Sequence, residues 1–193
     1  MLKIMVSQSE SEILSGCKKG EKDSFKLLFK KHSPWMMGIC LRYCQNRNDA
    51  KDVMQETLIK IFNGIEKFNY QTDAQFVAWL KRITVNTSLN FIREQSKNGF
   101  IMLEDHHSTL IINEEINDYN ESENIPQERL LEMINEMPSG YRAVFNMYVF
   151  DQMSHKEIAQ ELGISENTSK TQLMKARVFL KNMISKTVKS FTI

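Results

Sequence analysis

The residues from Ser154 to Lys181 carry the side chains best suited to contact a charged polymer. After Glu166 the sequence contains no Asp or Glu, and its charged side chains are all cations: Lys170, Lys175, Arg177, Lys181, Lys186 and Lys189. Amides, hydroxyls and cations without a carboxylate suit the base edges and phosphates of a DNA major groove. This stretch therefore indicates binding to double-stranded DNA.

Two helices around a tight turn are expected to position these side chains. Ser154 and Glu157 have the spacing of a capping box, which starts a first helix with an apolar side of Ile158, Ala159 and Leu162. Gly163 can take the positive φ that ends a helix, and Ser165 can cap the next one. The second helix turns Leu173, Ala176 and Leu180 inward and leaves the following residues on its other faces: Asn167, Lys170, Thr171, Met174, Lys175 and Arg177.

This pattern predicts a helix-turn-helix. The alternative interpretation is a solvated, lysine-rich surface helix on an ordinary bundle, and the charge run alone would favour it. The cap, the glycine turn and the acid-free second helix occurring together favour DNA binding instead.

The charges of the 193-residue chain are unevenly distributed, although the formal net charge is only +1. Residues 1–97 carry 16 basic and 10 acidic side chains, residues 98–125 carry 0 and 7, and residues 126–193 carry 9 and 7. Because both flanking blocks have helical periodicity, we expect an all-α fold of two small helical domains, 1–97 and 126–193, joined by a flexible acidic linker, 98–125. We expect a cytoplasmic protein, because the sequence lacks a membrane-spanning apolar run and a signal-peptide core.

Several helix boundaries can be predicted in the first block. Ser33 followed by Pro34 predicts the start of one helix, and Asn48 or Asp49 predicts the cap of another that runs to about Gly64. The apolar positions of that second helix are Val53, Met54, Leu58, Ile61, Phe62 and Ile65. A polar loop with an aromatic residue, Phe68 to Asp73, precedes a long helix from Ala74 to Glu94.

The aromatic side chains near this loop have two possible roles. Phe76 and Trp79 share a helix with amides and cations and could stack on unpaired bases, although core packing is the preferred interpretation for both. Tyr70, in the loop, is the better candidate for stacking.

Cysteine and histidine spacing does not indicate a metal site or a disulfide framework. Cys17, Cys40 and Cys44 lack CxxC spacing, so core packing is favoured, with a redox pair or half of a metal site at Cys40 and Cys44 left open. The cluster Glu104, Asp105, His106 and His107 lies in the expected flexible linker, where adjacent residues cannot converge on an ion without a scaffold. We expect no metal and no cofactor.

Three motifs carry a family resemblance. DAKDVMQETLIKIF (Asp49 to Phe62), FVAWLKRITVNTSLNFIR (Phe76 to Arg93) and YRAVFNMYVFDQMSHKEIAQELGISENTSKTQLMKARVFLK (Tyr141 to Lys181) resemble, in order and spacing, the extracytoplasmic-function sigma factors of bacterial RNA polymerase. The resemblance extends over most of the chain. It implies a promoter-specificity subunit without catalytic activity or a small-molecule substrate, with a sigma-two domain at 1–97 and a sigma-four domain at 126–193.

The resemblance also implies partners and residue roles. The sigma-two helix that begins near Asp49 would dock on the β′ clamp helices of core RNA polymerase. The residues that would make this contact are Asp49, Asp52, Gln55 and Glu56. The promoter −10 element would be captured and melted by Phe68, Asn69, Tyr70, Gln71, Thr72, Ile83, Asn86 and Asn90. Sigma-four would sit on the β flap and read the −35 element through Asn167, Lys170, Thr171, Met174, Lys175, Arg177 and Lys181. An anti-sigma factor is the further partner that the resemblance implies.

Two departures from the family pattern concern the recognition helix. The usual Gly-Thr-Val is replaced by Asn167, Thr168 and Ser169, and Gln172 replaces a common arginine, which leaves the −35 preference open. Two alternative functions also stay open: a stand-alone helix-turn-helix regulator that uses Ser154 to Lys181, and a metal-dependent enzyme that uses the Glu104 to His107 cluster.

Overall fold

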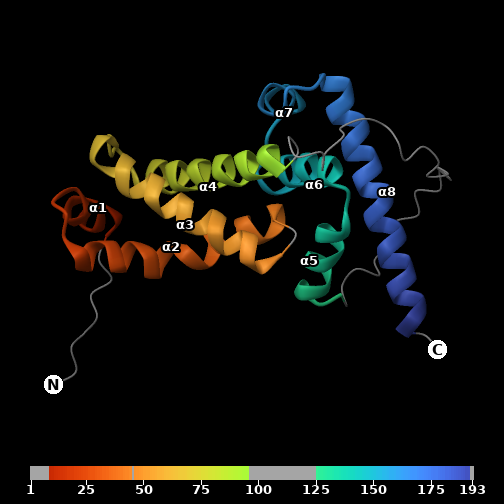
Figure 1. Cartoon of the computed structure of the whole chain (residues 1–193), viewed down its shortest axis with the longest axis horizontal. Coiled ribbons are helices and arrows are strands. Elements are labelled where there is room, and N and C mark those ends of the chain that lie inside the picture. Colours follow the sequence, from red (N-terminus) through yellow and green to blue (C-terminus); the bar gives the residue numbers. More distant parts are fainter. Residues whose placement is uncertain (1–8, 45, 96–124, 192–193) are drawn as a thin grey trace. The chain divides into compact units, whose positions relative to one another are not determined.

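In the computed structural model the described residues, 9–44, 46–95 and 125–191, form helices and connecting turns without strands (Figure 1). They divide into two compact units, Met1–Phe91 and Ile92–Ile193. The predicted all-α fold with two helical parts is confirmed. Nearly all of the predicted acidic linker lies outside the described residues. In the described part of the chain, no helix combines the length and the apolar character needed to cross a membrane.

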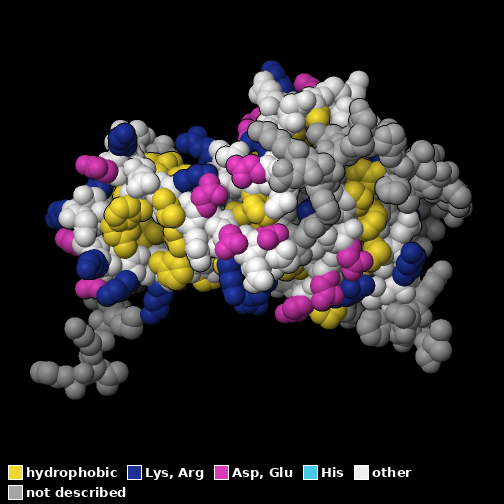
Figure 2. Space-filling model, viewed as in Figure 1, with side chains coloured by type: hydrophobic (Ala, Val, Ile, Leu, Met, Phe, Trp, Pro, Cys, Tyr) yellow, Lys and Arg dark blue, Asp and Glu magenta, His cyan; other side chains and the backbone are white. Residues whose placement is uncertain are grey.

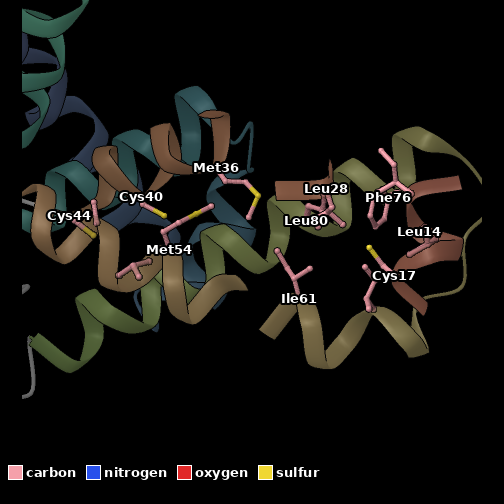
Figure 3. Packing of buried hydrophobic residues seen from close by; sticks show 14 residues of the cluster. Leu14, Cys17, Leu28, Met36, Cys40, Cys44, Met54, Ile61, Phe76 and Leu80 are labelled. Carbon is pink, nitrogen blue, oxygen red and sulfur yellow. The ribbon is translucent and has the colours of Figure 1, made fainter. Parts of the chain in front are cut away.

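The first unit is built from four α-helices and one short 3-10 helix among the described residues. In chain order these are α1 (Glu10–Lys18), α2 (Lys22–Tyr43), α3 (Arg47–Gly64), the 3-10 helix η1 (Ile65–Lys67) and α4 (Asp73–Gln95). Both α1 and α3 pack against α2 and against η1. Leu14, Leu28, Ile61 and Leu80, from four different helices, converge in the core (Figure 3). Every helix of this unit therefore contributes to one hydrophobic core.

Two predicted helix starts in this unit are wrong. No helix begins at Ser33, because α2 passes through Pro34 without a break. Proline inside a helix costs about 3 kcal/mol, but Pro34 is exposed while Leu28 and Met36 are buried on either side of it. Burial of one continuous apolar side offsets that cost. The cap of α3 is Asn46, whose Oδ1 accepts hydrogen bonds from the backbone N–H groups of Asn48 and Asp49 at 3.0 and 2.9 Å.

Phe62 is not a core residue, contrary to its predicted position. Val53, Met54, Ile61 and Ile65 are buried as expected, but the Phe62 side chain is 59% exposed. One residue along a helix turns the side chain by about 100°, so the packing of Ile61 toward the core places Phe62 at the edge. There its ring contacts Phe25 of α2 with the ring centroids 4.9 Å apart.

The second unit contains the other described helices. They are α5 (Gln127–Glu136), α6 (Ser139–Phe145), the π-helical segment η4 (Asn146–Phe150), α7 (His155–Leu162) and α8 (Glu166–Phe191). The long α8 packs against α5, α6 and α7. Met133, Val144, Met147, Ile158 and Ala176 are fully buried between these elements.

The predicted helix-turn-helix is confirmed by its hydrogen bonds and backbone angles. Ser154 Oγ accepts from the Glu157 N–H at 3.3 Å, and Glu157 Oε2 accepts from the Ser154 N–H at 2.8 Å. The hydrogen bonds from Ser154 hold the pKa of Glu157 below its usual value. Gly163 ends α7 with φ at +67°, and Ser165 Oγ accepts from the Thr168 N–H at 3.0 Å. Ser154 and Ser165 therefore cap the two helices, and Gly163 ends the first, as their positions in the sequence predict.

The three cysteines are buried free thiols in the first unit, so their predicted core packing is confirmed (Figure 3). Burial raises the pKa of Cys17 to about 11, and burial likewise raises the pKa of Cys40 to about 11. The thiolate is the reactive form of cysteine, and it is scarce at neutral pH at both positions.

We predict that these thiols react slowly with Ellman's reagent in the native protein at pH 8. Burial holds the pKa of Cys17 and Cys40 at about 11, so the thiolate is depleted, and both thiols are also inaccessible. Stopped-flow absorbance should show slow native labelling and fast labelling of all three thiols in guanidinium. Rapid native labelling of Cys40 would contradict its assignment to the core.

Candidate nucleic-acid interface

A pocket of about 600 Å³ opens in the first unit between α4 and the loop after η1. It brings together five of the eight residues predicted for −10 binding: Phe68, Asn69, Ile83, Asn86 and Asn90. They come from the loop and from successive turns of α4 that face it. The other three predicted residues, Tyr70, Gln71 and Thr72, are not part of the pocket lining.

Aromatic rings form one wall of this pocket. The ring centroid of Phe68 lies 4.8 Å from that of Trp79 and 5.5 Å from that of Phe76. Phe76 is fully buried, so its predicted core position is confirmed, whereas Trp79 is half-buried and lines the pocket. The apolar faces of Phe68 and Trp79 could contact a planar ligand such as a base.

The residues predicted for −10 binding did not include the cations that line the pocket. Lys60, Lys67 and Arg82 line it, and no Asp or Glu is among its lining residues. A signal for one of them was present in the sequence, because Arg82, Asn86 and Asn90 recur at intervals of four residues and so share a helix face. The pocket thus combines an apolar wall, three amides and three positive charges.

The remainder of the loop is tied to the start of α4. The Tyr70 hydroxyl donates a hydrogen bond to Asp73, which raises the pKa of Tyr70. Thr72 Oγ1 accepts from the Gln75 N–H at 3.2 Å, and Gln71 Oε1 accepts from Gln75 Nε2 at 3.1 Å. Tyr70, Gln71 and Thr72 therefore fix the path of the loop and leave the pocket wall to Phe68 and Trp79.

The polar face of α8 carries all seven residues predicted for −35 binding. Six are exposed and Lys175 is half-buried. Of the departures from the family pattern, only Asn167 is exposed, whereas Ser169 and Gln172 are 0% and 8% exposed. The substitutions at Ser169 and Gln172 therefore act inside the helix-turn-helix and not at the surface that would meet DNA.

Arg177 rests on an aromatic support that the sequence did not reveal. Its guanidinium carbon lies 5.8 Å from the centroid of the Tyr148 ring, within cation–π range. The Tyr148 ring stacks on His155 with centroids 4.8 Å apart, and His155 Nδ1 is hydrogen-bonded to the buried Ser169 Oγ at 2.9 Å. The supporting contacts of Arg177 thus pass through η4 and α7 and return to α8.

The residues predicted for polymerase docking lie on one helix, α3. Asp52, Gln55 and Glu56 are exposed, and Asp49 is half-buried with its Oδ2 accepting from Asn46 Nδ2 at 2.9 Å. Glu56 also pairs with Lys60 of the pocket, with Oε1 and Nζ 2.6 Å apart. Asp49 and Glu56 thus have partners within the chain, while Asp52 and Gln55 have exposed side chains.

Large exposed hydrophobic side chains extend this surface. Ile59 and Phe62 follow Gln55 at helical spacing on α3 and are 61% and 59% exposed, and Phe29 of α2 is 47% exposed. Figure 2 shows hydrophobic side chains gathered at the surface of this part of the first unit. A contiguous exposed apolar patch in a small protein marks a contact site for another macromolecule.

No group of three or more His, Cys, Asp or Glu side chains in the described part of the chain is placed to hold a metal ion. The Glu104 to His107 cluster lies outside the described residues.

Comparison with known proteins gives matches for both units. A model of Sigma-70 region 2 matches residues 28–98, and a model of Sigma-70, region 4 matches residues 127–180. The ECF RNA polymerase sigma-E factor of Haemophilus influenzae is 27% identical over 184 residues, which cover 91% of this chain and 95% of that protein. The ECF RNA polymerase sigma factor SigW of Bacillus subtilis is 25% identical over 178 residues, 86% of this chain and 92% of that protein.

Two solved structures share the fold. One is CnrH in complex with the cytosolic domain of CnrY, with a TM-score of 0.50 and 17% identity over 93% of this chain and 99% of that one. The other is the sigma factor RpoE in complex with the anti-sigma factor NepR from Bartonella quintana, with a TM-score of 0.51 and 18% identity over 83% of this chain and 96% of that one.

Proposed function

The chain belongs to the extracytoplasmic-function sigma factors of bacterial RNA polymerase, and from that premise we propose which of its residues perform each step of promoter recognition. Such a factor binds core polymerase and directs promoter-specific initiation of transcription. The first unit would dock on the polymerase and open the −10 element, and the second would read the −35 element. We assign sigma-two to residues 1–97 and sigma-four to residues 126–193, with 98–125 as the connection.

The pocket beside α4 is the observation that supports the −10 assignment most strongly. A base that leaves the duplex needs an apolar wall, polar groups for its edge, and cations for the flanking phosphates. Phe68 and Trp79 supply the wall, and Asn69, Asn86 and Asn90 supply the amides. Lys60, Lys67 and Arg82 would contact the phosphates on either side of the captured base.

For the −35 element, α8 would enter the major groove with its exposed face. Lys170, Thr171, Met174 and Arg177 would lie toward base edges, and Lys175 and Lys181 toward phosphates. The cation–π contact with Tyr148 holds Arg177 in one orientation before DNA arrives, which lowers the entropy lost on binding.

Docking on core polymerase would use the exposed face of α3. Asp52 and Gln55 would provide polar contacts to the β′ clamp helices, and Ile59 with Phe62 would add buried apolar area one and two turns further on. An interface with an apolar centre and a charged rim is typical of specific protein contacts. Asp49 would chiefly support the start of α3 through Asn46.

The remaining assignments follow from the family. Sigma-four would sit on the β flap, and an anti-sigma factor would cover the free protein, as the RpoE and NepR pair illustrates for a protein of the same fold. We propose no catalytic activity, because polymerase carries out the chemistry, and location in the cytoplasm with the polymerase. Docking on core polymerase through α3 would also distinguish this function from that of a stand-alone regulator.

We predict that the full chain co-elutes with core RNA polymerase on a sizing column and that Asp52→Ala with Gln55→Ala reduces this co-elution at least tenfold. Two side chains lost from a docking face cost roughly 1.4 kcal/mol or more together. The matched control is Glu94→Ala with Gln95→Ala, an exposed acid and amide at the end of α4. Wild-type chain that elutes alone yet binds duplex DNA tightly would favour a stand-alone regulator.

Asn86→Ala should reduce promoter opening about fivefold while leaving assembly with core polymerase unchanged. The substitution removes an amide that faces the captured base, and one such hydrogen bond contributes about 1 kcal/mol. Permanganate reactivity of unpaired thymines, on a promoter that the wild-type holoenzyme selects from a random duplex pool, measures the opening. Gln95→Ala is the control, an exposed amide on the same helix; an Asn86→Ala variant that opens promoters as wild type does would remove Asn86 from the site.

Arg177→Ala should weaken binding to the −35 element by about 1–3 kcal/mol if the guanidinium contacts a guanine edge in bidentate fashion. Footprinting of the holoenzyme on the selected promoter measures the loss. Lys186→Ala removes a cation further along α8 and should change affinity only slightly. An unchanged footprint in the Arg177 variant would exclude this residue from the interface.

A further inference from the structure

The first helix, α1, precedes the residues that match the region 2 model, yet it packs against η1 and contacts Phe68, the first residue of the loop beside the pocket. It has only nine residues, and isolated helices of that length are unstable in water. Ser9 and Glu12 form a capping box at its start, and Gly16 lies so close to α2 that a Cβ there would sit 1.9 Å from Ser24 Oγ. Tertiary contacts therefore fix α1 firmly against α2.

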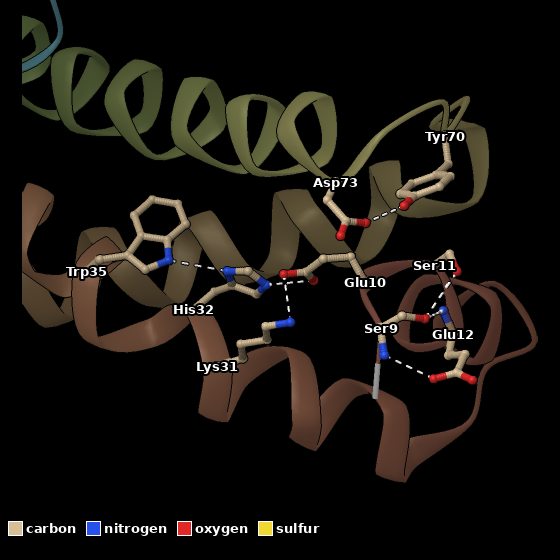
Figure 4. Close-up of polar contacts among 9 residues, drawn as sticks. All are labelled: Ser9, Glu10, Ser11, Glu12, Lys31, His32, Trp35, Tyr70 and Asp73. Atoms are coloured by element: carbon tan, nitrogen blue, oxygen red, sulfur yellow. Dashed lines mark hydrogen bonds and ion pairs between the residues drawn. The ribbon is translucent and has the colours of Figure 1, made fainter. Parts of the chain in front are cut away.

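Polar contacts through His32 connect Glu10 of α1 to Trp35 of α2 (Figure 4). The Glu10 carboxylate, 5% exposed, lies 2.9 Å from Lys31 Nζ and 3.0 Å from His32 Nε2. His32 Nδ1 accepts from Trp35 Nε1 at 3.2 Å. Because an indole N–H can only donate, Nδ1 carries no proton and Nε2–H donates to Glu10.

The His32 ring connects these polar contacts to the aromatic rings beside the pocket. It packs edge-on against Phe76 with centroids 6.1 Å apart, and Phe76 contacts both Phe68 and Trp79. One route from α1 to the pocket therefore runs through the core and reaches the rings of the aromatic wall.

A second route is direct, through Lys18 in the last turn of α1. Its Nζ donates a hydrogen bond to the Phe68 carbonyl at 2.7 Å, while the Phe68 ring lines the pocket. The end of the loop is tied to α4 by Thr72 and Gln75, as described above. Lys18 ties the start of the loop to α1, so the loop is held at both ends.

We propose that Lys18 is a positioning residue for −10 base capture: through the Phe68 carbonyl it sets the Phe68 ring against Trp79 and so holds the pocket open to a base. This inference rests on the proposed role of the pocket. The competing role for an exposed lysine is direct contact with a DNA phosphate, and the two differ in their effect on the protein without DNA.

The first test uses the full chain labelled with 5-fluorotryptophan, without DNA. Its two ¹⁹F signals, from Trp35 and Trp79, are assigned with Trp35→Phe and Trp79→Phe. Lys18→Met, which keeps an apolar stem but loses the ammonium, should shift or broaden the Trp79 signal and leave the Trp35 signal in place. Lys18→Arg should restore the wild-type signal, and Lys19→Met, which removes the same charge from the next exposed residue, should leave it unchanged.

The second test measures promoter opening with holoenzyme on a promoter that the wild-type holoenzyme selects from a random duplex pool. Lys18→Met should lower opening about fivefold to tenfold with core binding unchanged, and Lys18→Arg should recover most of it. Identical Trp79 signals in Lys18→Met and wild type, or full opening by Lys18→Met, would overturn the proposal. The competing role predicts a normal Trp79 signal in Lys18→Met and a slope of log K against log salt concentration that is smaller by about 0.7. That change is expected for one lost phosphate contact on a single strand, and this result would also overturn the proposal. Failure of the wild-type holoenzyme to select any promoter would instead contradict the proposed function.

Discussion

The buried ring of Phe76 is the contact on which the first unit depends. It lies against His32 of α2, Phe68 of the loop and Trp79 of α4, with centroids 6.1, 5.5 and 6.0 Å away. Phe76 is fully buried, so a core side chain lies directly behind Phe68 and Trp79, which form the wall of the pocket. Loss of a buried phenylalanine ring costs about 3–5 kcal/mol, so the position of the pocket wall is held by the stability of the core itself.

In the second unit the corresponding constraint is the turn at Gly163. Its φ of +67° is readily adopted only by glycine, and it directs the chain from α7 into α8. Packing of Leu173 and Ala176 then sets the rotation of α8. As a consequence, the residues after Glu166 that face outward are amides, hydroxyls, cations and Met174, while Ser169 and Gln172 face inward. The charge of this surface follows from the rotation of one helix.

The near-zero net charge of the chain conceals surfaces of opposite character. The exposed face of α3 combines Asp52 with apolar Ile59 and Phe62, whereas the pocket beside α4 is lined by cations and lacks acids. Electrostatic complementarity fixes orientation and partner choice more than it fixes affinity. The proposed docking face and the proposed −10 pocket therefore differ in charge within one small helical unit, although Glu56 and Lys60 meet where the two adjoin.

The sequence by itself determined the helical class and the helix-turn-helix, because caps, a glycine turn and apolar periodicity act through contacts a few residues apart. It also identified the five loop and α4 residues that meet in the pocket, through a family resemblance and not through geometry. Only the tertiary structure decided that α2 continues through Pro34, that Phe62 is exposed and that Trp79 lines the pocket while Tyr70 does not. The contacts of Arg177 with Tyr148 and of Phe68 with Lys18 could not be predicted from the sequence either, because the two pairs are separated by 29 and 50 residues, respectively. Contacts over such separations depend on how whole helices pack against one another, which the spacing of nearby residues does not predict.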